Sequence, residues 1–183
     1  MIATELVPSL PERPTDMPSP PSAEAVLHSL VRVNEQLASA PILWLSSVRP
    51  DGRPHIVPTW FDWDGEAITV FTKRDAQKVR NLRHVPSVMV ALGRAEANFA
   101  VELLEGEATV VDVPAGTADS GVRGPSPRFV DKYSEALAEA GLTIETFTAE
   151  YPQVIRIRLT RLLDWGARAT GSIEARGGAT AAV

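Results

Sequence analysis

Two turn signals between short alternating segments constrain the fold more than any other feature of this sequence. Residues 49–52 read Arg-Pro-Asp-Gly and residues 64–65 read Asp-Gly, which are the residue types that β-turns favour. Apolar and polar residues alternate in segments such as 67–72 and 154–163, as they do in half-buried strands. The pattern therefore predicts antiparallel strands joined by tight turns.

The same reading predicts about six strands and four helices. The strands cover 42–48, 54–62, 67–72, 87–92, 99–111 and 154–163. The helices cover 22–38, 76–84, 127–140 and 143–150. Gly106 is expected to mark a bulge or turn in its long strand. Short antiparallel strands with helices inserted between them favour a small closed or split barrel, because closure removes exposed strand edges.

The two ends of the chain differ in composition from its middle. Six prolines fall in 1–21, and alanine and glycine dominate 167–183, so we expect a flexible arm and a flexible tail. One domain is expected over 22–166, because 183 residues with 44% hydrophobic content can build one good core. A small domain with a deep ligand site often needs a partner chain, which favours a homodimer.

Composition also narrows the functional classes. The absence of cysteine excludes disulfides and thiolate chemistry, and the three histidines are too scattered to predict a metal site or a catalytic triad. A net charge of −5 argues against a nucleic-acid partner. Because no apolar run reaches the length of a membrane span and no signal pattern begins the chain, we expect a cytoplasmic protein without a membrane partner.

Residues 72–86 hold two of the three lysines of this acidic chain. They follow the predicted strand 67–72, and Asp75 is expected to cap a short helix with Lys78 in its first turn. Free backbone N–H groups and a lysine at a strand-to-helix junction form a phosphate site. A solvated basic helix is the alternative interpretation.

Aromatic residues are concentrated close to this junction. Trp60 and Trp63 lie on the segment expected to pair with 67–72, so a planar ring on that hairpin would place its phosphate at Thr72 and Lys78. Both tryptophans are equally consistent with a core position. A phosphorylated, flavin-like cofactor would supply hydride chemistry itself, which suits a chain without an evident acid–base set. His55 opens the same strand, and whether it faces a pocket is left open.

Several segments occur together in a familiar order. They include Pro58-Thr-Trp-Phe-Asp-Trp-Asp-Gly65, Phe71-Thr72 and Lys78-Val-Arg-Asn-Leu82. In these segments the chain resembles the pyridoxamine 5′-phosphate oxidase-like split-barrel superfamily over about residues 38–166, and within it the actinobacterial branch that binds the deazaflavin coenzyme F420. The resemblance implies a mainly β fold with added helices, an antiparallel six-stranded split β-barrel. It also implies a homodimer with cofactor sites between the subunits.

The resemblance also implies the residues that bind the cofactor. Lys78 matches the lysine that holds the phosphate, and Thr72 the residue beside it. Gln77 stands where the oxidase has arginine, and the arginine-rich FMN strand is absent, which favours F420 over FMN. The full predicted set is Val57, Pro58, Thr59, Trp60, Thr72, Lys73, Arg74, Gln77, Lys78 and Asn81.

The predicted function is hydride transfer between reduced F420 and a small organic substrate. An FMN-dependent reductase of the same fold is the first alternative, and a non-catalytic cofactor carrier or a haem-binding protein is the second, with His55 as the histidine nearest the expected groove. F420 carries an anionic tail, for which a basic track is expected. Its candidates are Lys73, Arg74, Arg80, Arg83, Arg156 and Arg158.

Overall fold

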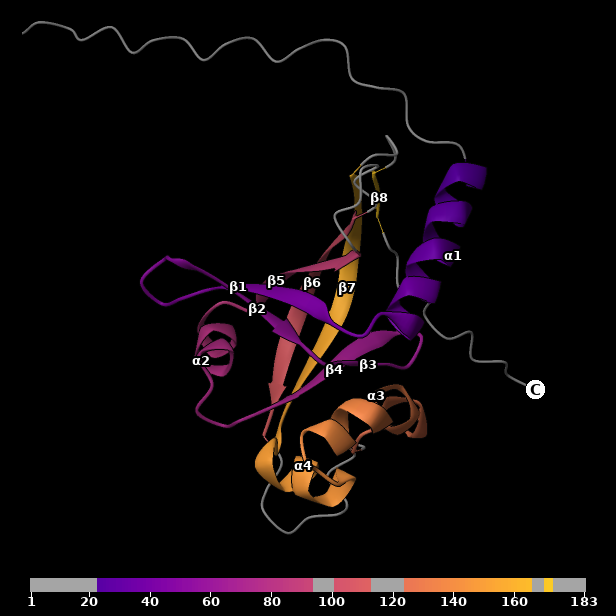
Figure 1. Ribbon diagram of the computed structural model, residues 1–183. Coiled ribbons are helices and arrows are strands. Elements are labelled where there is room, and N and C mark those ends of the chain that lie inside the picture. The colour runs from indigo at the N-terminus through magenta and orange to yellow at the C-terminus, as the bar shows by residue number, and fades with distance from the viewer. Residues whose placement is uncertain (1–22, 94–100, 113–123, 166–169, 173–183) are drawn as a thin grey trace, which may run out of the picture.

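The computed structural model describes residues 23–93, 101–112, 124–165 and 170–172. Within them, all strands join one curved antiparallel sheet in the order β2-β1-β5-β6-β7-β4-β3, with β8 paired to β7 (Figure 1). The strands are β1 Leu43–Val48, β2 Pro54–Thr59, β3 Asp62–Trp63, β4 Ala67–Thr72, β5 Ser87–Gly93, β6 Val101–Val111, β7 Gln153–Trp165 and β8 Thr170–Ser172. The helices are α1 Ala23–Ser39, α2 Gln77–His84, α3 Pro127–Glu139 and α4 Ile144–Glu150.

This architecture confirms the predicted mainly β split barrel with added helices, but the strands outnumber the six expected. One addition, β8, falls in the predicted tail; the rest of that tail and the whole predicted arm lie outside the described residues. The other arises because the predicted strand 54–62 divides into β2 and β3. The Tyr133 hydroxyl donates to the carbonyl of Phe61 at 3.3 Å and accepts from its N–H at 3.1 Å, which takes Phe61 out of the strand ladder.

The predicted pairing of segment 54–62 with 67–72 is wrong for most of its length. β2 pairs with β1, and only the two residues of β3 pair with β4. In the strand order, β2 and β3 stand at opposite ends of the sheet. Trp60 therefore lies outside the β3–β4 hairpin, whereas Trp63 shares that hairpin with Thr72.

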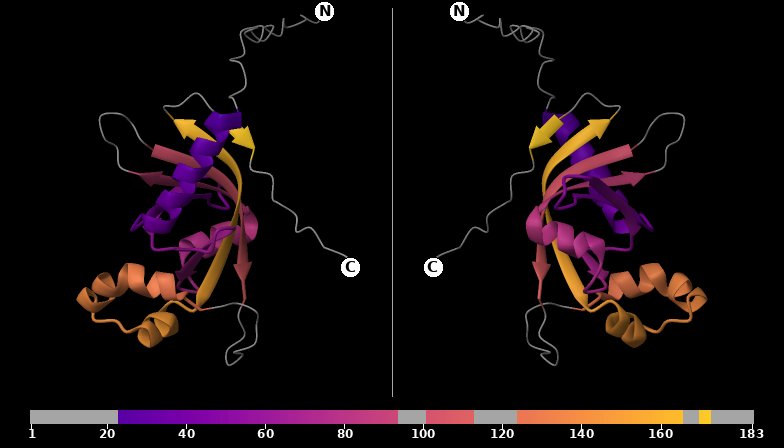
Figure 2. Two further views of the ribbon diagram at one scale, coloured as in Figure 1. Left: turned by 90° about the vertical axis from the view of Figure 1, so that its right-hand side faces the viewer. Right: turned by 90° about the vertical axis from the view of Figure 1, so that its left-hand side faces the viewer.

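The long strands β6 and β7 connect the two halves of the fold. Figure 2 shows β7 curving from the end near α1 to the end occupied by α3 and α4. The register between β6 and β7 shifts between Glu105 and Gly106, which confirms the predicted bulge. A Cβ atom at Gly106 would lie 2.8 Å from the carbonyl oxygen of Arg158, so only glycine fits this close approach of two backbones.

Two hydrophobic clusters hold the fold together. The first is mostly aliphatic, lies inside the curved sheet and includes Leu45, Val90 and Ile155. The second is largely aromatic and joins α3 and α4 to the sheet. Its buried members are Phe71, Phe129, Tyr133, Leu137, Phe147 and Val154.

The helices begin and end close to their predicted bounds. The hydroxyl of Ser126 caps α3 by accepting the N–H of Phe129 at 3.2 Å, and Thr143 forms a capping box at the start of α4. The predicted Asp75 cap of α2 is wrong, because Ala76 occupies that position and offers no capping side chain. None of the described helices is both long and apolar enough to cross a membrane.

Candidate functional site

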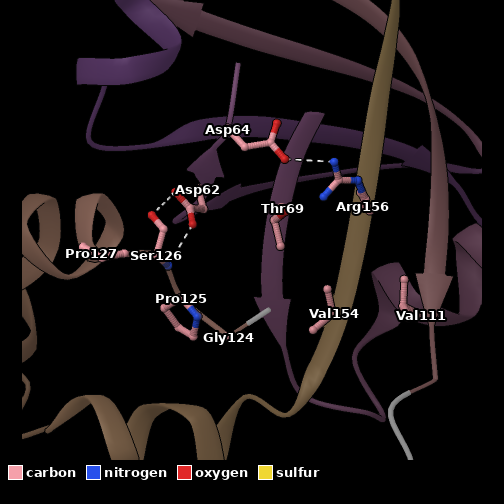
Figure 3. A pocket seen from close by; sticks show the side chains of 10 residues that line it. All are labelled: Asp62, Asp64, Thr69, Val111, Gly124, Pro125, Ser126, Pro127, Val154 and Arg156. Carbon is pink, nitrogen blue, oxygen red and sulfur yellow. Dashed lines mark hydrogen bonds and ion pairs between the residues drawn. The ribbon is translucent and has the colours of Figure 1, made fainter. Parts of the chain in front are cut away.

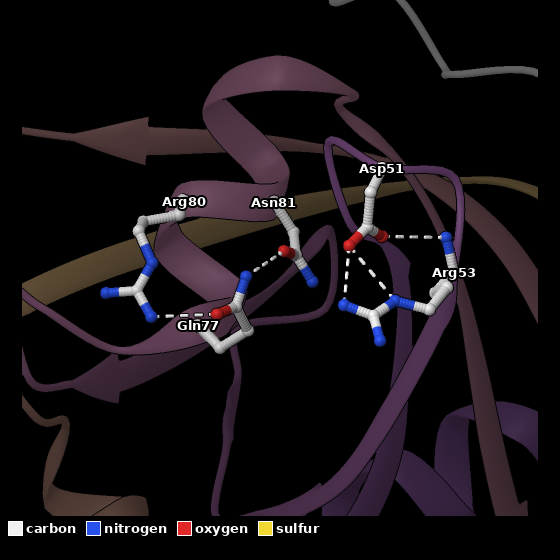
Figure 4. Close-up of polar contacts among 5 residues, drawn as sticks. All are labelled: Asp51, Arg53, Gln77, Arg80 and Asn81. Carbon is white, nitrogen blue, oxygen red and sulfur yellow. Dashed lines mark hydrogen bonds and ion pairs between the residues drawn. The ribbon is translucent and has the colours of Figure 1, made fainter.

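Helix α2 is fixed against strand β1 by a buried asparagine. The Asn81 side-chain amide donates to Ser47 Oγ at 2.9 Å and accepts from Gln77 Nε2 at 2.7 Å. Gln77 in turn accepts from Arg80 at 2.8 Å (Figure 4). Because Asn81 is fully buried and both ends of its amide have protein partners, it braces the helix.

Lys78 and Thr72 meet where β4 leads into α2, as the sequence predicts. Lys78 Nζ donates to Thr72 Oγ1 at 3.1 Å, and Thr72 is buried. Lys78 is half-buried, and burial lowers the pKa of its amino group. It forms no ion pair with any carboxylate in the described part of the chain. Among the described residues, the hydrogen-bond partner of this positive charge is one neutral hydroxyl.

The neighbouring basic residues are arranged differently. Lys73 Nζ lies 2.9 Å from Glu150 Oε1, and this hydrogen bond raises the pKa of Lys73. Its amino group also lies 5.5 Å from the ring centroid of Tyr151. Arg74 is exposed on the loop before α2. The structure thus directs Lys73 toward α4 and leaves Lys78 as the predicted lysine that faces Thr72.

The predicted ring-binding segment 57–60 separates into parts with different surroundings. Along β2, Val57 and Thr59 are half-buried, whereas Pro58 is exposed on the opposite face. Trp60 lies beyond the strand and stacks on Tyr133, with ring centroids 4.7 Å apart and an interplanar angle of 13°. The Trp60 indole therefore packs against the aromatic cluster.

Two residues outside the predicted site set lie on the side of β1 and β2 that faces α2. His55 pairs with Ser47 in the β1–β2 register. Arg49 lies two residues beyond Ser47, just past the end of β1. Burial, then the charges of Arg49 and Lys78, lowers the pKa of His55, so both cations lie near the imidazole. The alternation of β1 could have indicated Arg49, but its place in an evident turn concealed it.

Most of the predicted basic track is neutralised by the protein itself. Arg80 donates to the backbone carbonyl of Asp75 at 2.6 Å as well as to Gln77. Three further arginines are each paired with a carboxylate: Arg83 with Asp112, Arg156 with Asp64 at 2.9 Å and Arg158 with Glu107 at 2.6 Å. These ion pairs engage three of the residues that were expected to meet an anionic tail.

A hollow of about 740 Å³ lies where α3 approaches β3, β4 and β7 (Figure 3). Asp62 accepts hydrogen bonds from the N–H and hydroxyl of Ser126, at 3.0 and 2.9 Å, and Asp64 pairs with Arg156. The charged groups that line the hollow thus have protein partners, and neither Lys78 nor Thr72 lines it. Among the described residues, no group of three or more histidine, cysteine, aspartate or glutamate side chains could hold a metal ion.

Comparison with solved structures gives the same fold. A protein related to general stress protein 26 from Clostridium acetobutylicum matches with a TM-score of 0.56 and 15% identity, covering 80% of this chain and 94% of that one. HutZ, the haem storage protein of Vibrio cholerae, matches with a TM-score of 0.50 and 19% identity, covering 73% and 92%. A structure named F420 reductase has 26% identity and a TM-score of 0.46, covering 70% and 94%.

No curated protein matches the sequence. The family model for pyridoxamine 5′-phosphate oxidase matches residues 31–150, which include β1 to β6, α2, α3 and the Lys78 corner. This match covers well over half of the chain. The protein therefore belongs to the pyridoxamine 5′-phosphate oxidase family, whose fold the described residues share.

Proposed function

We propose that this protein binds the deazaflavin coenzyme F420 and transfers hydride between the reduced coenzyme and a small organic substrate. The observation that carries the proposal is Lys78, a half-buried cation bonded to Thr72 Oγ1 at 3.1 Å and paired with no described carboxylate. A buried charge is costly unless it is compensated, and a bound phosphate would compensate it.

The backbone at the start of α2 supports a phosphate at this corner. Ala76 provides no side-chain cap, so the first N–H groups of the helix are left for a ligand or for water. These groups, the Lys78 amine and the Thr72 hydroxyl are all donors that suit a phosphate oxygen. In the proposed complex these groups bind and orient the cofactor, while bound F420 supplies the hydride chemistry.

Strand β2 supports the proposed position of the planar ring. It stands at the end of the sheet order and pairs only with β1 among the described strands, so its other edge offers backbone donors and acceptors. Val57 and Thr59 would contact the ring by their side chains, and Pro58 only by its main chain. The α2-facing side of β2 carries no arginine, which favours F420 over FMN.

A second copy of the chain is the proposed partner. Trp44, Ile56 and Met89 are 43%, 58% and 36% exposed, respectively. Strand register places Ser46 opposite both Ile56 and Met89, so these apolar side chains share the outer face of β2, β1 and β5. An exposed apolar face of this kind suits an interface between two copies. Light scattering should show a dimer that Ile56→Glu converts to monomer; a monomeric native protein would contradict this.

Calorimetric titration with F420, FMN and haem tests the cofactor assignment. F420 alone should bind saturably, and Lys78→Ala should weaken it by roughly 10- to 100-fold, the loss expected for a charged hydrogen bond. Lys73→Ala is the matched control, because Lys73 is exposed and paired with Glu150. Tighter FMN or haem binding would overturn the F420 assignment.

Catalysis needs a separate measurement. Reduced F420 should be oxidised in the presence of the protein and some member of a panel of enones and quinones. The Lys78→Ala variant should show the same maximal rate at a much higher cofactor concentration, because Lys78 is proposed to bind and not to react. Saturable F420 binding without turnover of any substrate would refute the oxidoreductase part of the proposal.

A further inference from the structure

One of the three lysines of the chain lies on helix α3, away from the other two. The amino group of Lys132 lies 3.7 Å from the ring centroid of Phe61 and 5.1 Å from that of Tyr133. Phe61 is fully buried, and Lys132 itself is half-buried. Lysine side chains ordinarily keep their amino groups in water, so an amine held against aromatic rings is unusual.

The Lys132 amine lacks an oxygen partner. It forms no hydrogen bond or ion pair with any residue that the structure describes. The charge of Asp62 acts on it, but both oxygens of that carboxylate are engaged by the N–H and hydroxyl of Ser126, at 3.0 and 2.9 Å (Figure 3). A ring face attracts an ammonium ion less strongly than a carboxylate that accepts its hydrogen bonds. The charged form of this amine is therefore poorly stabilised.

These surroundings favour a neutral amine. Burial lowers the pKa of Lys132 to about 8, although the charge of Asp62 acts in the opposite direction. Burial also raises the pKa of Tyr133, so its hydroxyl stays neutral beside the amine. A lysine with a pKa of about 8 is neutral in roughly a tenth of the molecules at pH 7, against fewer than about one in a thousand for an ordinary lysine. Lys132 thus has the free lone pair that a nucleophile needs.

A small hollow beside Lys132 limits what can approach it. The hollow has a volume of about 20 Å³ and lies where α3 meets β3 and the end of α1. Its lining residues are Ala38, Asp62, Trp63, Arg128, Phe129 and Lys132. That volume holds about one water molecule, so only a small reacting group can approach the amine from this side.

Arg128 gives the hollow a preference for an anionic partner. It lies one turn before Lys132 on α3, lines the same hollow and is exposed. In the part of the chain that the structure describes, Arg128 forms no hydrogen bond or ion pair. Its guanidinium N–H groups are therefore available, and their geometry suits the oxygens of a phosphate.

We infer that Lys132 is an acylation site whose partner is a small acyl phosphate. The neutral amine nitrogen attacks the carbonyl carbon, and a C–N bond forms. The bond from that carbon to the phosphate oxygen breaks with its electron pair, and the nitrogen releases a proton to water. The products are an amide at Lys132 and free phosphate. The modification removes the charge of Lys132 and its cation–π contact with Phe61, and it does not depend on the proposed cofactor.

Competitive labelling of the intact protein tests the reactivity of Lys132. The protein is treated briefly with acetyl phosphate at several pH values, unfolded, labelled to completion with a deuterated acetylating reagent and digested for mass spectrometry. Lys132 should react at least roughly tenfold faster than Lys73, whose pKa is raised by its hydrogen bond with Glu150. The rate at Lys132 should level off as the pH passes about 8.

The unfolded chain is the control for this measurement. In denaturant the burial of Lys132 is lost, so Lys132 and Lys73 should react at similar rates. A difference that persisted there would assign the reactivity to local sequence and contradict the inference. Equal rates at the two lysines in the folded protein, or the same pH profile for both, would overturn it.

Two acetyl donors of different charge test the part assigned to Arg128. Arg128→Gln should slow acetylation of Lys132 by acetyl phosphate by roughly threefold to tenfold, because an exposed charge attracts the anionic donor. Acetylation by neutral acetic anhydride should be nearly unchanged in this variant. Arg158→Gln is the matched control, because Arg158 is exposed and paired with Glu107. Equal effects of Arg128→Gln on both donors, or no effect on either, would overturn the choice of an acyl phosphate.

Discussion

Two sets of basic side chains in this protein differ in burial and in pairing. Arg156 and Arg158 extend from the exposed face of β7, and each pairs with a carboxylate, Asp64 or Glu107. Lys78 and His55 are half-buried between α2 and the β1–β2 hairpin and have no carboxylate partner among the described residues. The exposed arginines are paired within the protein, whereas the half-buried set has no counter-ion in the part of the chain that the structure describes.

This difference separates charges that are paired within the protein from charges that lower the stability of the free protein. Exposed ion pairs contribute roughly 0–1 kcal/mol each, so the ion pairs of β7 add little to stability. A buried cation without a carboxylate destabilises the free protein, because its desolvation is not repaid by an opposite charge. Groups of the second kind are retained when a ligand repays that cost, which is why the cluster around Lys78 indicates function.

The largest effect on stability should come from replacing Asn81, whose side chain fixes α2 against β1 and so positions Lys78. Asn81→Ala leaves Ser47 without its donor and Gln77 without its acceptor, and should lower the free energy of unfolding by about 2 kcal/mol. It should also weaken F420 binding, because Lys78 is carried by the same helix. Chemical denaturation and calorimetry measure both. Loss of stability with full affinity would show that the position of α2 does not matter for binding.

A change of opposite sign is expected at Lys78 itself. Lys78→Met keeps the length and apolar stem of the side chain but removes the buried charge, and should raise the free energy of unfolding by about 1 kcal/mol. The exposed control, Arg158→Met, should change it by no more than about 0.5 kcal/mol. Denaturant titration compares the two variants. If Lys78→Met lowered stability as much as a core substitution does, the charge would be compensated in the free protein.

The pH dependence of stability should reveal His55. Burial and the charges of Arg49 and Lys78 hold the pKa of folded His55 below its ordinary value of 6.5. Between that lowered pKa and 6.5 the unfolded chain binds more protons, so stability should fall as the pH decreases through this window. His55→Gln should remove that part of the slope in denaturation curves recorded above and below pH 6.5. An unchanged slope would mean that burial and the two cations do not lower the pKa of His55.

The smallest effect concerns ionic strength. Salt screens exposed charges. A higher ionic strength should therefore alter the free energy of unfolding by only a few tenths of a kcal/mol through the β7 ion pairs. The affinity for inorganic phosphate should fall much more, because chloride competes for the buried cations. Parallel measurements of stability and phosphate affinity across a salt series compare the two sets directly. Equal sensitivity would abolish the distinction between them.

Much of the fold was accessible from the sequence because it is encoded locally. Alternation along 154–163, the Asp-Gly turn before β4 and the glycine after α3 each fix an element within a few residues. The division of segment 54–62 was not accessible, because the Tyr133 hydroxyl that takes Phe61 out of the ladder lies 72 residues away. Strand pairing at β2 failed for the same reason, since long-range contacts decide it.

The candidate site was predicted only in part. Lys78 and Thr72 follow one another closely in the chain, and their contact matches the prediction from local spacing. Which arginines have carboxylate partners depends on residues far along the chain, as with Arg156 and Asp64, so the sequence alone did not predict these ion pairs. The stacking of Trp60 was likewise not predictable, because α3 supplies the ring that it contacts.

The most direct test of the account is the unfolding free energy of the native protein and of Lys78→Met with and without F420. A ligand that binds only the folded state adds about 2.7 kcal/mol at 100 times its dissociation constant. The native protein should gain about this amount at that F420 concentration. Lys78→Met, although more stable on its own, should gain far less at the same concentration. Equal gains in both proteins would contradict the claim that the unpaired cation at Lys78 binds the cofactor phosphate.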